Sequence, residues 1–320
     1  MKTVFRSLEE AAGNFGPCAL TIGNFDGVHL GHRTLIHQTR QLAHNNGWAS
    51  GVLTFDPHPA VVVAPERAPQ MIYSLHDRLR LLEQVGAERI LVLPFTREIS
   101  LMAPEEFIET VLVSGLDARA VVVGQNFHFG RRQSGTPEVL AEYGAKYGFD
   151  CHFLAPIVYR GKVVSSTAIR GHLSKGNIGR ANRLLGRCFA IAGEVVSGHG
   201  IGSKQTVPTL NLKPGGEIVP AWGVYISETE DASTGRRWPS ITNIGNRPTF
   251  GGDEVTIETF LLADLVGAAP EYISVSLRRW VRGERVFPDA PSLRAQILRD
   301  VERAKTYWRR VERLSLPAAQ

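Results

Sequence analysis

The chain has 320 residues and a formal net charge of +5; 43% of its residues are hydrophobic and 21% are charged. This length is typical of two domains, and this composition is ordinary for a globular protein that buries real cores. The mild positive charge suits anionic small ligands and weak nucleic-acid contact alike. No basic run is dense enough to act as a nucleic-acid-binding arm.

The cysteines and the start of the chain indicate the compartment. Cys18, Cys151 and Cys188 lie far apart and form no C-x-x-C pair, which favours a reducing cytoplasm over a disulfide framework. Residues 1–7 lack the apolar core of a signal peptide, and no uncharged apolar stretch is long enough to span a membrane. We therefore expect a cytoplasmic protein with no membrane partner.

The first half of the chain alternates short apolar segments with amphipathic ones. Apolar strands separated by helices predict an α/β domain with a parallel sheet covered on both faces. Ligands of such sheets bind beyond the carboxyl ends of the strands, and polar or glycine-rich clusters follow Ile22, Phe55 and Val123. The predicted strands are 18–22, 49–55, 89–95, 118–123 and 150–155, and the predicted helices are 33–45, 74–85, 103–113 and 136–147.

The second half is dominated by strand patterns. Several short strands punctuated by Gly, Pro and Asn predict a β-barrel or a sandwich, and a C-terminal helix over 292–310 closes the chain. We expect domains at 1–184 and 185–313. Two short helices are predicted at 167–173 and 178–185, and strands at 189–196, 223–230, 238–244, 255–262 and 273–281.

The segment 23–32 reads Gly-Asn-Phe-Asp-Gly-Val-His-Leu-Gly-His and joins a predicted strand to a predicted helix. A helix N-terminus offers unpaired N–H groups and a positive dipole end, which suit phosphate. The glycines allow the backbone to approach a phosphate closely, and two imidazoles can stabilise charge as pyrophosphate leaves. The residues expected to act there are Gly23, Phe25, Gly27 and Gly31, with His29 and His32 as the catalytic pair.

Other interpretations of the two histidines are weaker. A zinc site needs a further ligand, and no His, Cys or carboxylate follows at zinc-like spacing. A histidine at a helix start is often only structural, but the whole segment is far more specific than the pair. No Walker A loop accompanies it, because residues 200–205 have the wrong order and spacing for one.

Three further strings follow in order: 55–59 (Phe-Asp-Pro-His-Pro), 124–130 (Gly-Gln-Asn-Phe-His-Phe-Gly) and 165–170 (Ser-Ser-Thr-Ala-Ile-Arg). Together with segment 23–32 they resemble the FAD synthetase module of bacterial bifunctional riboflavin kinase/FAD synthetases, a member of the HIGH-type nucleotidyltransferases. The resemblance implies a Rossmann-like nucleotidyltransferase domain that transfers AMP from ATP to FMN, giving FAD and pyrophosphate.

The resemblance also assigns residues outside segment 23–32. The hydroxyls of Ser165, Ser166 and Thr167 precede a helix, where they can cap it and reach phosphate oxygens, and Arg170 offers a charged fork. The flavin or adenine is expected to contact Asn126, Phe127 and Phe129; for the two phenylalanines, packing in the core is an equally good explanation.

The second half resembles the riboflavin kinases through the strings 207–212 (Val-Pro-Thr-Leu-Asn-Leu) and 243–250 (Asn-Ile-Gly-Asn-Arg-Pro-Thr-Phe), and through the closing helix. The resemblance implies that Thr209 and Asn211 supply hard oxygen ligands to Mg²⁺, which bridges ATP phosphates. Glu258 lies where that family places its catalytic base, which would accept the proton of a ribityl hydroxyl as riboflavin attacks the γ-phosphate.

Two departures from the kinase pattern concern ATP. The loop at 200–207 lacks the family's arginines and carries Thr206 where the family has a glycine; Lys204 can replace the arginines only as a point charge. The family's tyrosine after the glutamate strand is replaced by Val266. Both departures bear on kinase rate and ATP affinity more than on kinase identity.

The expected function is therefore phosphorylation of riboflavin to FMN followed by adenylylation of FMN to FAD, with riboflavin, FMN and ATP as partners, no nucleic acid, and a monomer or weak homo-oligomer. Three alternatives remain open. One is a monofunctional FAD synthetase whose barrel phosphorylates weakly or only binds flavin. Another is a relative of the cytidylyltransferases or pantetheine-phosphate adenylyltransferases. The third is a non-catalytic flavin carrier or nucleic-acid-binding protein.

Overall fold

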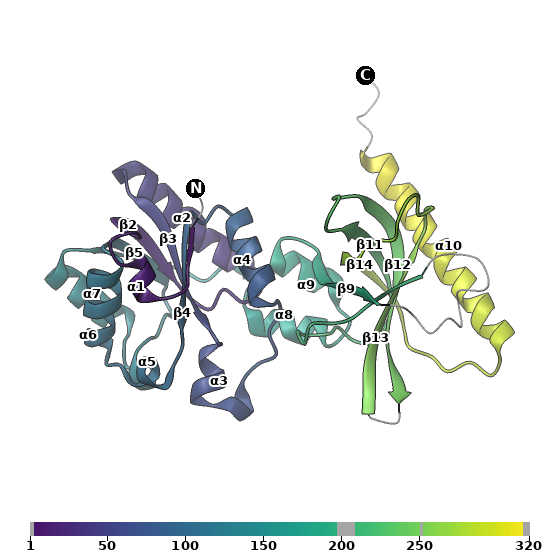
Figure 1. The fold of residues 1–320 in the computed structure, drawn as a ribbon, viewed down its shortest axis with the longest axis horizontal. Coiled ribbons are helices and arrows are strands. Elements are labelled where there is room, and N and C mark those ends of the chain that lie inside the picture. The colour runs from purple at the N-terminus through teal and green to yellow at the C-terminus, as the bar shows by residue number, and fades with distance from the viewer. Residues whose placement is uncertain (1–2, 197–208, 250–251, 316–320) are drawn as a thin grey trace, which may run out of the picture. The chain divides into compact units, whose positions relative to one another are not determined.

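The computed structural model describes residues 3–196, 209–249 and 252–315, and the chain divides into two compact units, Met1–Ser166 and Thr167–Gln320 (Figure 1). The elements of the first unit are β1 (Thr3–Phe5), α1 (Leu8–Ala11), β2 (Cys18–Ile22), α2 (Leu30–Asn46), β3 (Ala49–Asp56), α3 (Pro59–Val63), α4 (Leu75–Gln84), β4 (Arg89–Pro94), α5 (Arg97–Leu101), α6 (Pro104–Phe107), the π-helix η2 (Ile108–Gly115), β5 (Ala118–Gly124), α7 (Pro137–Tyr147), β6 (Asp150–Leu154) and the hairpin β7 (Val158–Tyr159) and β8 (Lys162–Val163).

The first unit is built on a six-stranded sheet in the order β1-β4-β3-β2-β5-β6, and every pairing in it is parallel. This confirms the predicted α/β class. The edge strand β1 has three residues, too few to produce a sequence pattern, and it was not predicted. The helix predicted at 103–113 is in fact α6 followed by the π-helix η2.

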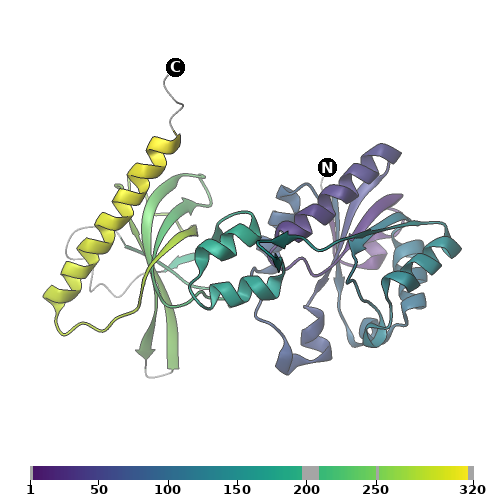
Figure 2. The same cartoon turned by 180° about the vertical axis from the view of Figure 1, so that it is seen from behind.

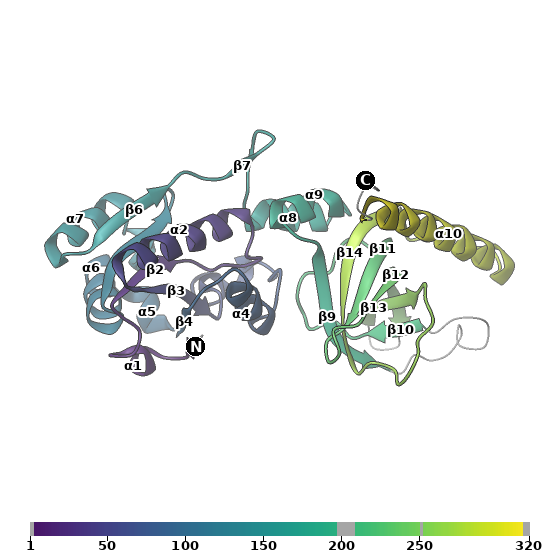
Figure 3. The ribbon, with the colours of Figure 1, turned by 90° about the horizontal axis from the view of Figure 1, so that it is seen from above.

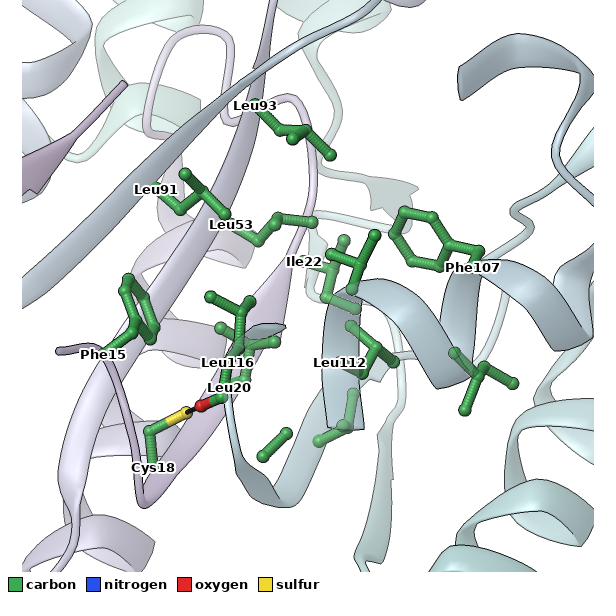
Figure 4. Packing of buried hydrophobic residues seen from close by; sticks show 14 of the residues in the cluster. Phe15, Cys18, Leu20, Ile22, Leu53, Leu91, Leu93, Phe107, Leu112 and Leu116 are labelled. Carbon is green, nitrogen blue, oxygen red and sulfur yellow. Dashed lines mark hydrogen bonds between the residues drawn. The ribbon is translucent and has the colours of Figure 1, made fainter. Parts of the chain in front are cut away.

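Helices cover both faces of this sheet because neighbouring residues of each buried strand point to opposite sides. Ala19 packs with Ala43 of α2, and Figure 3 shows α2 lying along β2 and β3. Leu20 packs on the other side, in a core shared with η2 (Figure 4). There the Cys18 thiol donates to the carbonyl of Leu116 at 3.4 Å, and burial raises the pKa of this thiol to about 12.

The second unit centres on a closed antiparallel barrel in the order β10-β13-β12-β11-β14-β9, which confirms the barrel among the two predicted all-β architectures. The short strand β10 was not predicted; it is recognised only by its pairing with β9 and β13. The elements are α8 (Ser166–Leu173), α9 (Ile178–Leu185), β9 (Phe189–Val196), β10 (Thr209–Leu212), β11 (Gly223–Asp231), β12 (Arg237–Thr249), β13 (Gly252–Leu261), β14 (Tyr272–Gly283) and α10 (Ala290–Ser315).

The interior of the barrel contains a chain of buried hydroxyl groups rather than aliphatic side chains alone. Its members bond to one another at 2.7–2.9 Å across β11, β12 and β13, in the order Thr229, Ser240, Ser227, Thr242 and Thr259. All five are fully buried. Each hydroxyl can donate and accept, so a connected chain satisfies buried polar groups that would be costly alone.

Helix α9 packs with the barrel through Asn182, whose amide donates to the carbonyl of Leu277 and whose side-chain oxygen accepts the N–H of Phe189, both at 2.8 Å. The compact units separate between Ser166 and Thr167, within the first turn of α8. The domain boundary at 184–185 stays a prediction.

Helix α10 lies along the outside of the barrel (Figure 2) and is joined to β14 by an ion pair. Arg282 donates through Nε to the Asp300 carboxylate at 2.7 Å, and the Gln296 amide donates to the other carboxylate oxygen at 2.9 Å. The two charged side chains are only 10% and 3% exposed. An apolar contact of Ile226 and Ile241 with Val301 continues the same interface.

We expect Asp300→Ala to lower the free energy of unfolding of the barrel unit by about 3 kcal/mol, because it leaves the Arg282 charge buried without its partner. Urea unfolding followed by tryptophan fluorescence measures this, since four of the five tryptophans lie in this unit. Glu302→Ala is the matched control on the same helix: it removes an exposed pair with Lys305 at 3.4 Å and should cost less than about 1 kcal/mol. Equal effects of the two substitutions would contradict the prediction.

Candidate active sites

The chain leaves β2 through a tight turn in which three residues have positive φ: Phe25 (47°), Gly27 (85°) and Val28 (37°). Only glycine adopts this region freely, and a non-glycine residue there costs about 1–3 kcal/mol. Phe25 and Val28 remain in it with side chains that are fully buried, and the Val28 N–H donates to the Phe25 carbonyl at 3.0 Å. The core thus fixes this turn in a conformation that the local sequence disfavours.

The turn delivers His29 to the N-cap of α2, where its Nδ1 accepts the backbone N–H of His32 at 3.4 Å. The two imidazoles stack with ring centroids 3.6 Å apart. The rings of Phe25 and His32 pack in a T-shaped arrangement with their centroids 5.1 Å apart. Because Nδ1 of His29 is an acceptor, a neutral ring carries its proton on Nε2, from which it can donate to a phosphate oxygen. A Cβ on Gly31 would lie 3.2 Å from the His29 ring, which explains the glycine at that position.

Asp26 connects this turn to segment 165–170, the second segment predicted to bind phosphate. Its carboxylate, 1% exposed, accepts the N–H of Ile72 at 2.9 and 3.2 Å, and its carbonyl accepts the hydroxyl of Ser166 at 2.8 Å. The structure therefore brings Ser166 and the adjacent Ser165 to the histidine turn. Thr167, which is exposed, and Arg170, half-buried, follow in α8 and fall in the second compact unit.

A buried arginine that sequence reasoning missed contacts the same turn. Arg78 of α4 is 1% exposed and donates to the carbonyls of Asn24 and Phe55, each at 3.0 Å. Burial lowers the pKa of its guanidinium from the ordinary value, while the nearby carboxylates of Asp56 and Asp26 act in the opposite direction. The available signal was its position on the otherwise apolar face of a helix, three residues after Leu75.

The residues predicted to contact flavin follow β5, the neighbour of β2 in the sheet. Asn126 is exposed and Phe127 is half-buried. Phe129 is 8% exposed, stacks on Phe127 with centroids 5.4 Å apart, and contacts Phe107 at 5.7 Å. Phe129 therefore belongs to the core, and direct flavin contact by any of the three stays a prediction.

In the barrel, strand pairing places Asn211 of β10 opposite Glu258 of β13, and Glu258 opposite Asn243 of β12. Paired residues of neighbouring strands have Cβ atoms about 5 Å apart, so the three side chains form one row. Thr209, exposed, lies two residues before Asn211 on the same face. Leu210, Leu212, Ile257 and Thr259 alternate with these positions and are buried inside the barrel.

Lys204, Thr206 and Pro208 lie outside the described residues. Among residues 3–196, 209–249 and 252–315, no group of three or more His, Cys, Asp or Glu side chains could hold a metal ion. Over the same part of the chain, no helix is long and apolar enough to cross a membrane.

A phosphate-suited turn at the edge of a parallel sheet, and a carboxylate beside hydroxyl and amide groups on a barrel, define a two-part enzyme that uses nucleoside triphosphates. Family models agree with this class: the FAD synthetase model matches residues 12–168, and the riboflavin kinase model matches residues 185–308. The chain belongs to the family of bifunctional riboflavin kinase/FMN adenylyltransferases.

Curated relatives carry that same description. Those of Escherichia coli K12 and Pseudomonas fluorescens are each 34% identical to this chain; the alignments cover 91% and 90% of it and 93% and 92% of the relatives. The relative from Haemophilus influenzae is 31% identical over 95% of this chain and 99% of its own length. A crystal structure described as a macrolide-efflux protein from Streptococcus pneumoniae superimposes with a TM-score of 0.84 at 24% identity, covering 95% and 98% of the two chains, which shows a shared fold.

The enzyme therefore carries both activities, phosphorylation of riboflavin to FMN and adenylylation of FMN to FAD, and uses ATP as co-substrate. The monofunctional alternative is not favoured, because both domain models match and the relatives are described as bifunctional.

We expect Gly31→Ala to lower the rate of adenylyl transfer about tenfold, because the added methyl must displace the His29 ring from its position. Riboflavin phosphorylation and the thermal stability of the protein should not fall, since alanine favours a helix more than glycine does. Gly179→Ala in α9 is the control, because a Cβ there meets nothing within 4 Å. Steady-state rates of FAD formation from FMN measure the effect; a normal rate in Gly31→Ala would contradict it.

Proposed function

We propose that adenylyl transfer takes place at the turn between β2 and α2, and that His29 and His32 are its catalytic residues. The observation that carries this proposal is the geometry of the two stacked imidazoles at the N-terminus of α2, where a neutral His29 carries its proton on Nε2. The positive end of the helix dipole favours the negative charge of a triphosphate there. The backbone of Gly23, Phe25, Gly27 and Gly31 lines the approach.

In this proposal the FMN phosphate oxygen attacks the α-phosphorus of ATP. The new P–O bond forms as the bond to the β-phosphate breaks, and pyrophosphate leaves. The attacking oxygen is already ionised at neutral pH, so the site needs no strong base. His29 and His32 donate to the phosphate oxygens where negative charge develops, and this electrostatic term lowers the barrier.

Further phosphate contacts are proposed for Ser165, Ser166, Thr167 and Arg170. The bond from Ser166 to the histidine turn supports its own assignment. Thr167 and Arg170 are supported by the resemblance of their string to the second phosphate signature of the family, and by the fixed charge of guanidinium. We assign flavin contact to Asn126 and Phe127, with Phe129 supporting Phe127 from the core side.

We propose that Glu258 is the general base of the kinase reaction. It accepts the proton of a ribityl hydroxyl of riboflavin, whose oxygen then forms a bond to the γ-phosphorus of ATP as ADP leaves. Thr209 and Asn211 are proposed as Mg²⁺ ligands; their hydroxyl and amide belong to the same face of β10, and Asn211 pairs with Glu258, which supports the assignment. When bound, the ion neutralises charge on the phosphates. Lys204 is proposed to provide a further cation.

We also infer that residues 1–184 and 185–313 are the two functional domains, supported by the riboflavin kinase match from residue 185. The protein is proposed to act in the cytoplasm as a monomer or weak homo-oligomer, without nucleic acid. Three free cysteines support a reducing compartment, and burial raises the pKa of Cys151 to about 11, which keeps its thiol protonated.

The double substitution His29→Ala with His32→Ala should reduce FAD formation from FMN at least about a hundredfold, because it removes the donors to the developing charge. FMN formation from riboflavin by the same protein should be unchanged. His44→Ala, an exposed histidine near the end of α2, is the matched control. Chromatographic separation of FMN and FAD over time measures both reactions. A normal adenylylation rate in the double variant would show that another site performs the reaction.

Glu258→Gln should reduce FMN formation about 10²–10⁴-fold while leaving FAD synthesis from supplied FMN intact, because the amide keeps the shape of the side chain but accepts no proton. Glu271→Gln, an exposed position just before β14, serves as the control. Retained kinase activity in Glu258→Gln would point to another base.

A further inference from the structure

Arg78 connects a turn and a strand end that lie far from it in the sequence. Its Nη1 donates to the carbonyl of Asn24, 54 residues away, and its Nη2 donates to the carbonyl of Phe55, 23 residues away. Asn24 belongs to the turn after β2, and Phe55 lies at the carboxyl end of β3. One planar guanidinium thus holds the backbone of two adjacent strand ends at a fixed separation.

The contacts of these two carbonyls lead directly to the histidines. Asn24 precedes Phe25, which has a positive φ. The Phe25 ring packs against the His32 ring in a T-shaped arrangement. Phe55 lies three residues before His58, and the Asn24 amide is 3.2 Å from Nε2 of His58. Thr54 also donates to the Asn24 carbonyl, at 3.3 Å. Side chains from β3 (Thr54) and from α4 (Arg78) therefore both donate to the Asn24 carbonyl.

A role in stability alone explains this arrangement poorly. Arg78 occupies a 1% exposed position on the apolar face of α4, where an aliphatic side chain would bury area without the cost of desolvating a charge. The Asp56 carboxylate at 3.7 Å is half-exposed and gives weak compensation. Leucine or methionine could not donate the two hydrogen bonds that the guanidinium makes to the carbonyls of Asn24 and Phe55.

We propose that Arg78 is a positioning residue for adenylyl transfer: by bonding the Asn24 and Phe55 carbonyls it fixes the turn that carries His29 and His32. This inference rests on the proposed function of that turn. The histidines act on charge that develops in the transition state, so a turn that shifts affects the chemical step more than substrate binding.

The decisive variant is Arg78→Lys, which keeps the charge but reaches only one of the two carbonyls. The expected result is a folded protein whose kcat for FAD formation falls about 10–100-fold, as for a small misplacement of catalytic groups, while the KM for FMN changes less than about twofold. Riboflavin phosphorylation in the same sample serves as an internal standard and stays unchanged. Arg80→Lys is the matched control: Arg80 lies two residues along α4, is half-exposed, and pairs with Asp77 at 3.5 Å.

Thr54→Val tests the same carbonyl without touching Arg78, since it removes the hydroxyl that donates to Asn24 and keeps the shape of the side chain. A smaller fall in kcat, again without a change in the KM for FMN, supports the proposal. In Arg78→Ala, methylguanidinium added at millimolar concentration should restore part of the rate; a chain that is simply less stable gains nothing from it. If Arg78→Ala does not fold, the lysine and valine variants still decide.

The proposal is overturned if folded Arg78→Lys has the normal kcat, or if its loss of rate only matches a loss of folded protein measured by circular dichroism and thermal unfolding. The double variant His29→Ala with His32→Ala, assayed beside it, separates the two levels of inference. A normal rate there overturns the assignment of the site itself. A lost rate there together with a normal rate in Arg78→Lys overturns only the role of Arg78.

Discussion

The parallel pairing of β2 with β3 is the constraint on which the proposed adenylyl-transfer site depends. Because the strands run in the same direction, their carboxyl ends meet at one edge of the sheet; Ile22 pairs with Leu53, three residues before β3 ends at Asp56. The other contacts of the site are made at that edge of the sheet. Arg78 donates to the Asn24 carbonyl in the turn after β2 and to the Phe55 carbonyl near the end of β3. The Asp26 carboxylate accepts the Ile72 N–H, and the Ser166 hydroxyl donates to the Asp26 carbonyl. These contacts fix the position at which helix α2 begins, with His29 as its N-cap.

The two reactions require different chemistry, and the two folds provide it. A ribityl hydroxyl is a weak acid, so its attack on ATP benefits from a carboxylate base, and a strand residue on the outer face of the barrel such as Glu258 suits that role. The FMN phosphate is already an anion, so its attack benefits from donors that stabilise charge, and two imidazoles at a helix N-terminus suit that one. The product of the first reaction is the substrate of the second.

Each fold also maintains its geometry by a different physical means. The α/β unit places strained backbone at Phe25 and Val28 and retains it by burying both side chains completely. The barrel satisfies a row of buried hydroxyls internally and fastens α10 by the pair of Arg282 and Asp300. In both units, polar groups are placed in the interior where their bonds fix one arrangement of neighbouring strands.

The sequence by itself determined the class of both units and the reactions of the family. Apolar runs separated by helices indicated a parallel sheet, and short strands punctuated by Gly, Pro and Asn indicated an all-β unit. The strings around His29, Ser166 and Glu258 identified the chemistry, because these signals are local. Tertiary structure alone decided the rest. Strands β1 and β10 are too short to produce a pattern, and α6 continues into a π-helix that periodicity does not distinguish. Arg78 contacts the site only because folding brings α4 against strand ends 23 and 54 residues away, and no local spacing encodes such contacts.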